Sequence, residues 1–132
     1  ISDFGITKVS RGEDLNVGVI VGTPNYMAPE QARGEDPDGR ADIYAVGCML
    51  FEMTAGSLPL KTEKILDLVR RKAKNPDTVF EKRPTEVNPR LHPELENIIL
   101  KAVKSVPGDR FSSCQEFIQA LEKFRTSPLK DE

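Results

Sequence analysis

The 132-residue sequence has no tryptophan, a single histidine and only two cysteines. No nucleophile triad can be built on the lone His92, and its place before Pro93 predicts a role at the start of a helix. Cys48 and Cys114 lie 66 positions apart without a Cys-x-x-Cys pair. We therefore expect free thiols, with Cys48 buried in its apolar run, as in a protein of the reducing cytosol.

The sequence also lacks an excess of positive charge and any long apolar run. A net charge of −2 argues against a nucleic-acid binder, which needs basic side chains for the phosphates. No apolar stretch reaches 18 residues and no signal peptide is recognisable, so we expect no membrane segment in this chain and a cytoplasmic location. With 30% charged and 38% apolar residues, a globular fold is expected.

Two binding loops are excluded by their residues. Residues 34–41, GEDPDGRA, have the glycine spacing of a P-loop, but Arg40-Ala41 replace the lysine and the hydroxyl that contact phosphate and magnesium. The acidic interior of this stretch would also repel phosphate. An EF-hand is excluded because the loop glycine is misplaced and position twelve has no glutamate.

Hydrophobic periodicity predicts a mainly α fold. The stretch 42–55, DIYAVGCMLFEMTA, is apolar nearly all round and predicts a buried central helix, with Asp42 capping its first turn and Gly56 ending it. Residues 6–40 show no helical period and predict loop, with one helical turn after Pro29. The connector 75–92 carries three prolines and also predicts loop.

Three amphipathic helices are expected around the central helix. The first has Ile65, Leu68 and Val69 on one face and a basic last turn at 70–72. The second runs from Pro93 to Lys104. The third follows a capping box of Ser113 and Glu116, and its apolar stripe comprises Cys114, Phe117, Ile118, Leu121 and Phe124.

Four motifs stand in a fixed order along the chain. Asp3-Phe4-Gly5 comes first, GTPNYMAPE follows at 22–30, DIYAVG at 42–47 and PGDRF at 107–111. Together they resemble the eukaryotic-like serine/threonine protein kinases, with the bacterial members most similar through YMAPEQARG. The resemblance covers essentially the whole chain and implies the C-terminal helical lobe of the kinase fold, from the Asp-Phe-Gly onward, preceded by a long activation segment.

The resemblance implies an ATP- and magnesium-dependent transfer of phosphate to a serine or threonine hydroxyl of a protein substrate. Asp3 corresponds to the magnesium ligand, Phe4 to the packing residue of that loop and Gly5 to its turn. Thr23 corresponds to the residue that places the acceptor hydroxyl. The acceptor peptide would lie along Gly22, Thr23, Pro24, Asn25 and Tyr26.

Three further residues have architectural roles in the family. Glu30 would pair with Arg110, and Asp42 would hydrogen-bond the backbone of the catalytic loop. Tyr44 and Ala45 replace the more usual tryptophan and serine of the central helix.

Other family motifs are absent from these residues. There is no Gly-rich loop, no phosphate-pairing lysine of the V-A-I-K type and no H-R-D-x-x-x-x-N. All of them precede the Asp-Phe-Gly, so we expect a chain cut from something longer, whose partner is the rest of the kinase domain upstream of Ile1, and we expect residues 1–132 alone to be inactive. The alternative is a non-catalytic docking module derived from a kinase lobe.

The resemblance divides the chain into residues 1–126, the C-terminal part of a kinase catalytic domain, and 127–132, a disordered tail or the start of a linker. Within the first, 3–30 is the activation segment and 31–126 the helical subdomain. Thr7 and Ser10 are the only hydroxyls between Gly5 and Gly22, and are therefore the candidate phosphosites. The β-prone VGVIV at 17–21 raises the hypothesis of a dimer that exchanges this segment.

Overall fold

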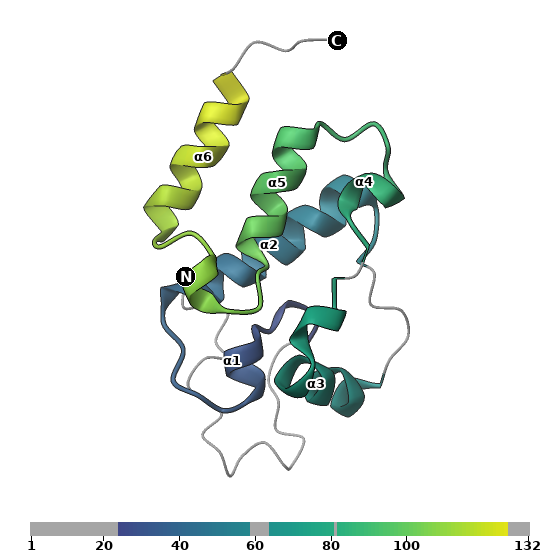
Figure 1. Cartoon of the computed structure of the whole chain (residues 1–132), viewed down its shortest axis with the longest axis vertical. Coiled ribbons are helices and arrows are strands. Elements are labelled where there is room, and N and C mark those ends of the chain that lie inside the picture. Colours follow the sequence, from purple (N-terminus) through teal and green to yellow (C-terminus); the bar gives the residue numbers. More distant parts are fainter. Residues whose placement is uncertain (1–23, 59–63, 81, 127–132) are drawn as a thin grey trace.

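A computed structural model describes residues 24–58, 64–80 and 82–126 (Figure 1). Within these ranges the fold is mainly helical and contains no strand, as predicted. The elements in chain order are η3 (Pro24–Tyr26), α1 (Pro29–Ala32), α2 (Gly39–Ala55), α3 (Ile65–Lys74), η4 (Pro76–Thr78), α4 (Pro84–Val87), α5 (Pro93–Ala102), η5 (Pro107–Asp109) and α6 (Cys114–Thr126). Helix α2 crosses the middle of the molecule, and α4, α5, α6 and η3 all contact it.

The buried residues of the central helix α2 lie between Ala41 and Phe51, as its apolar composition predicts, whereas Met53 in its last turn is 76% exposed. Its predicted start at Asp42 is wrong: Asp38 is the N-cap, and the helix begins at Gly39, three residues before Asp42. The Asp38 carboxylate accepts a hydrogen bond of 2.9 Å from the Arg40 backbone N–H, and the helix begins at Gly39. Its end is as predicted, since Gly56 adopts a left-handed conformation with φ of 94°.

Helices α2 and α5 approach each other closely at Gly47. A Cβ atom on this residue would lie 2.7 Å from the Cβ of Ala102 and 2.8 Å from Cγ1 of Val103. Only glycine leaves room for this contact, which brings the end of α5 and the residues after it against the central helix.

The position of helix α3 in the chain was predicted correctly, but only part of its predicted apolar face is buried. Leu68 and Val69 are buried as expected, whereas Ile65 is 57% exposed. Lys72, part of the predicted basic last turn, is completely buried. Helix α5 ends at Ala102, two residues before the predicted Lys104.

Side chains at the helix starts explain two further boundaries. His92 caps α5, since its Nδ1 accepts a hydrogen bond of 3.0 Å from the Glu94 N–H, in the predicted entry role. Only one of the two hydrogen bonds of the predicted capping box of α6 is formed. Ser113 Oγ accepts from the Glu116 N–H at 3.1 Å, but Glu116 accepts from the N–H of Ser112 at 2.7 Å rather than from that of Ser113.

The predicted stripe of α6 is also only partly buried. Phe117 is buried and stacks on Phe111 with ring centroids 5.0 Å apart. Ile118 is 57% exposed and Cys114 is exposed, because α6 packs on the body only along the side of Phe117. Both cysteines are free, and Cys48 is buried as predicted. Burial raises the pKa of the Cys48 thiol to about 12.

The connector 75–92 contains η4 and α4 and is therefore more regular than its prolines suggested. The buried carboxylate of Glu96 holds α4 against α5. It accepts hydrogen bonds from the Thr85 backbone at 2.9 Å and hydroxyl at 2.6 Å, and from Arg83 at 3.2 Å. Burial pushes the pKa of Glu96 upward, but these bonds together outweigh it and the pKa is lowered.

Candidate functional site

The predicted site residues fall into two groups. Seven of them lie outside the described residues: Asp3, Phe4, Gly5, Thr7, Ser10, Gly22 and Thr23. The segment 17–21 also lies outside them. The others are described: Pro24, Asn25, Tyr26, Glu30, Asp42 and Arg110. Among the residues that the structure describes, no three His, Cys, Asp or Glu side chains are grouped so as to hold a metal ion. The described part of the site therefore consists of the loop at 24–32 and the contacts that hold it.

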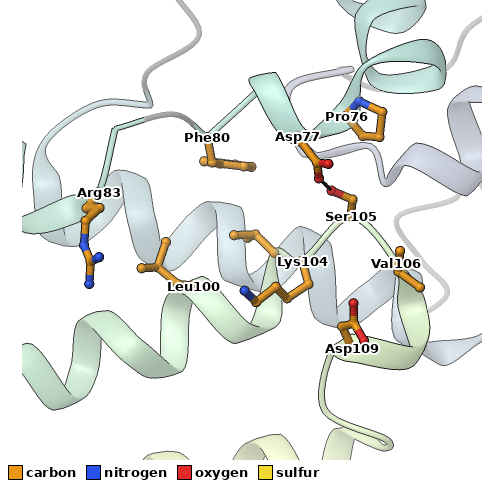
Figure 2. Close-up of a pocket in the computed structure, with 10 residues that line it drawn as sticks. Pro76, Asp77, Phe80, Arg83, Leu100, Lys104, Ser105, Val106 and Asp109 are labelled. Atoms are coloured by element: carbon orange, nitrogen blue, oxygen red, sulfur yellow. Dashed lines mark hydrogen bonds between the residues drawn. The ribbon is translucent and has the colours of Figure 1, made fainter.

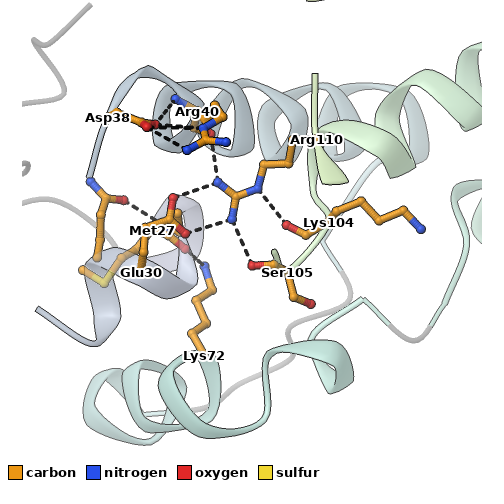
Figure 3. Close-up of polar contacts among 10 residues, drawn as sticks. Met27, Glu30, Asp38, Arg40, Lys72, Lys104, Ser105 and Arg110 are labelled. Atoms are coloured by element: carbon orange, nitrogen blue, oxygen red, sulfur yellow. Dashed lines mark hydrogen bonds and ion pairs between the residues drawn. The ribbon is translucent and has the colours of Figure 1, made fainter. Parts of the chain in front are cut away.

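Glu30 and Arg110 form a buried, bidentate ion pair (Figure 3). The two guanidinium nitrogens Nη1 and Nη2 lie 2.8 Å and 2.9 Å from the two carboxylate oxygens. The Arg110 side chain is 0% exposed and that of Glu30 is 6% exposed, so the pair is shielded from water and from salt. The pair joins α1 to the residue that directly follows η5, 80 positions later in the chain.

The remaining donors of Arg110 reach backbone carbonyl oxygens. Nε donates to Lys104 at 2.7 Å, Nη1 to Arg40 at 2.9 Å and Nη2 to Ser105 at 3.2 Å. All five guanidinium hydrogens thus have partners, which is what a buried arginine requires. One side chain therefore links α1, the start of α2 and the turn after α5.

Lys72 makes a second set of contacts to the same loop, from helix α3 (Figure 3). Its Nζ donates hydrogen bonds to the backbone oxygens of Pro24 at 2.7 Å, Asn25 at 2.9 Å and Met27 at 2.7 Å. Burial lowers the pKa of Lys72 to about 8. At neutral pH the side chain is therefore still mostly an ammonium group, with three hydrogens for three carbonyl oxygens.

The two buried cations share one aromatic ring. Lys72 Nζ lies 5.3 Å and Arg110 Cζ 5.0 Å from the ring centroid of Tyr44, both within the range of cation–π attraction. Tyr44 is the residue that stands at the usual tryptophan position of the central helix, and it is 1% exposed. The ring thus lies beside both contacts that hold residues 24–32.

Tyr26 ties the loop directly to α2. Its hydroxyl donates a hydrogen bond of 2.5 Å to the Glu52 carboxylate. This hydrogen bond, together with burial, raises the pKa of Tyr26 to about 12. Asp42 lies half-buried in the first turn of α2.

Of these residues, Lys72 was missed from the sequence. It was assigned with Arg70 and Arg71 to a basic last turn only, although its spacing carries a further signal. Lys72 stands three and four positions after Val69 and Leu68, which places it on the buried face of α3. Every residue has a backbone carbonyl group, so the sequence could not show which oxygens accept hydrogen bonds from Lys72.

A cavity of about 400 Å³ lies between the connector after α3 and the turn after α5 (Figure 2). Phe80 and Leu100 line it together with charged groups such as Arg83 and Lys104, and Asp77 and Ser105 are hydrogen-bonded at its edge. None of the predicted site residues lines it. The cavity borders the site through Lys104 and Ser105, whose backbone oxygens accept hydrogen bonds from Arg110.

The sequence of the chain matches one known family model over most of its length. The protein kinase domain model matches residues 1–122. The chain belongs to the protein kinase domain family. Its helical body is the C-terminal lobe of the kinase fold. No helix in the described part of this kinase chain is long and apolar enough to cross a membrane.

Bacterial kinases are among the similar proteins. Serine/threonine-protein kinase Pkn1 of Myxococcus xanthus is 38% identical over 92% of this chain, which corresponds to 17% of that protein. Kinase pkn3 of the same organism is 35% identical over 95% of the chain and 24% of its own length. Tyrosine-protein kinase MasK of M. xanthus strain DK1622 is 40% identical over 98% of the chain and 20% of its length. The chain thus spans about a fifth of these relatives.

Proposed function

We propose that this chain forms the C-terminal part of a serine/threonine protein kinase, which transfers the γ-phosphate of ATP to serine or threonine hydroxyls of proteins. In this proposal residues 1–126 belong to the catalytic domain, with the activation segment at 3–30 and the helical subdomain at 31–126. Residues 127–132 are a tail or the start of a linker.

The observation that carries the proposal is the buried Glu30–Arg110 pair. The pair fixes Glu30, the last residue of the GTPNYMAPE motif at 22–30, to the helical body. An enzyme that positions an acceptor requires such a fixed segment. The relatives include kinases named for serine/threonine and one named for tyrosine. The Gly22-Thr23-Pro24 motif favours serine or threonine as the acceptor.

The roles nearest the chemistry belong to residues outside the described ranges. Asp3 would hold magnesium, which neutralises the charge that develops on the transferred phosphate. Thr23 would place the acceptor hydroxyl, and Gly22 to Tyr26 would line the path of the acceptor peptide. Thr7 and Ser10 are the candidate sites of regulatory phosphorylation. Activity would need the Gly-rich loop, lysine and catalytic Asp and Asn that residues 1–132 lack.

The test is a phosphotransfer assay on the complete polypeptide that carries these residues. Labelled ATP, magnesium and myelin basic protein are supplied, and the phosphorylated amino acids are identified. We expect phosphoserine or phosphothreonine, and loss of the signal in an Asp3→Asn variant that still folds. Phosphotyrosine would contradict the acceptor class. No transfer at all, together with specific capture of a protein by the helical surface, would favour the docking module.

A further inference from the structure

Lys72 occupies a place on α3 where an apolar side chain would be expected. It is 0% exposed, and no carboxylate in the described ranges pairs with it. Burying a cation is unfavourable unless hydrogen bonds replace its water. Here three backbone oxygens of one short loop replace it, from positions 45, 47 and 48 residues earlier in the chain.

The three oxygens suit an ammonium group better than any other side chain. An ammonium donates three hydrogens in a tripod, whereas a guanidinium donates in a plane. A methionine of similar length would fill the space and would leave the three carbonyl groups without this donor. The contact therefore constrains the loop backbone in a way that apolar packing could not.

These contacts fix the orientation of residues 24–27. The carbonyl groups of Pro24, Asn25 and Met27 point inward to Lys72, and the Tyr26 hydroxyl is held by Glu52. The Asn25 residue remains exposed. The loop thus presents one fixed face to the outside, directly after the Gly22-Thr23 that the proposed function assigns to the acceptor hydroxyl.

We propose that Lys72 is a positioning residue for the acceptor polypeptide, acting through the backbone of residues 24–27 and not on ATP. This inference rests on the proposed function and deepens it. Since Lys72 is buried and its three ammonium hydrogens are taken by backbone oxygens of the loop, its removal should weaken productive binding of the protein substrate while the ATP site keeps its affinity.

The test compares three variants of the complete polypeptide with the unchanged protein. Lys72→Met removes the donors, Lys72→Arg keeps the charge but changes its geometry, and Lys74→Met alters an exposed lysine of the same helix. For each, KM and kcat are measured with myelin basic protein and with ATP. The hydrolysis of ATP without an acceptor is measured separately.

We expect Lys72→Met to lower kcat/KM for myelin basic protein by about tenfold or more. KM for ATP and acceptor-free ATP hydrolysis should stay within about twofold of the unchanged protein. Lys72→Arg should show the same split at smaller size, and it serves as the test if Lys72→Met does not fold. Lys74→Met should behave like the unchanged protein.

A parallel fall of all parameters in Lys72→Met and Lys72→Arg would mean a merely structural role and would overturn the inference. Unchanged kinetics for myelin basic protein in a folded Lys72→Met would overturn it as well. Both results leave the proposed function standing. If the unchanged protein neither transfers phosphate nor hydrolyses ATP, the proposed function fails and the positioning role fails with it.

Discussion

Two buried cations hold segment 24–32 against the helical body, and they do so by different chemistry. Arg110 faces a carboxylate and three carbonyl oxygens, whereas Lys72 faces three carbonyl oxygens alone. Arg110 holds the α1 end through Glu30, and Lys72 holds the η3 end through the backbone. The ring of Tyr44 lies beside both.

The difference determines what happens when either cation is lost. Without Arg110, Glu30 becomes a buried charge with its counter-ion removed, which is costly. Without Lys72, only neutral carbonyl groups lose a partner, and a cation that had been taken out of water is no longer buried. The two losses should therefore differ in size and in the part of the loop that they release.

The largest effect should come from Arg110→Met. Because Glu30 would remain buried without its partner, we expect the free energy of unfolding to fall by about 3–5 kcal/mol. Chemical denaturation of the variant and of the unchanged protein measures this. Combining it with Glu30→Met should recover part of the loss. A loss below about 1 kcal/mol for Arg110→Met would contradict the central place of this pair.

Lys72→Met should have a smaller effect on stability. We expect a loss of about 1–3 kcal/mol, because buried carbonyl groups lose their donor while no charge is stranded. The same denaturation experiment measures it, with Lys74→Met as the exposed control expected within about 0.5 kcal/mol of the unchanged protein. A loss as large as that of Arg110→Met would remove the distinction between the two contacts.

Tyr26→Phe should cost less again, about 1 kcal/mol, because a single hydrogen bond to Glu52 is lost at a partly exposed site. The pKa of Tyr26 is raised from 10.0 to about 12, so the folded state favours the protonated phenol. The stabilisation is therefore fully present below pH 10 and lost as the pH rises through 12. Unfolding free energies of the unchanged protein and of Tyr26→Phe should converge over that range. A difference that does not depend on pH would argue against the bond.

The smallest effect should come from an ion pair at the surface. On α6, Nη2 of Arg125 lies 2.9 Å from Oε1 of Glu122, but the two side chains are 71% and 57% exposed. We expect Arg125→Ala to change the free energy of unfolding by about 0.5 kcal/mol or less. A thermal melt at low and at high salt checks this. A large loss would show that charge pairing, and not burial, sets the cost in this protein.

The sequence predicted the mainly helical fold, the buried central helix and the partners Glu30 and Arg110. These follow from apolar patterning and from motifs in which each partner is a recognisable residue type. It failed at the start of α2, where Asp38 competes with Asp42 as the cap, and at Lys72. In both cases the decisive contact is made with the backbone, which has the same chemistry at every residue and leaves no pattern to detect.

The most direct test of the two distinct contacts is hydrogen exchange at the amides of segment 24–32. The amide of Met27 donates to Pro24 and that of Ala32 to Ala28, so they report on the η3 end and on the α1 end. We expect Lys72→Met to speed exchange at Met27 more than at Ala32, and Arg110→Met to do the reverse. Equal acceleration at both amides in both variants would contradict separate roles for the two cations.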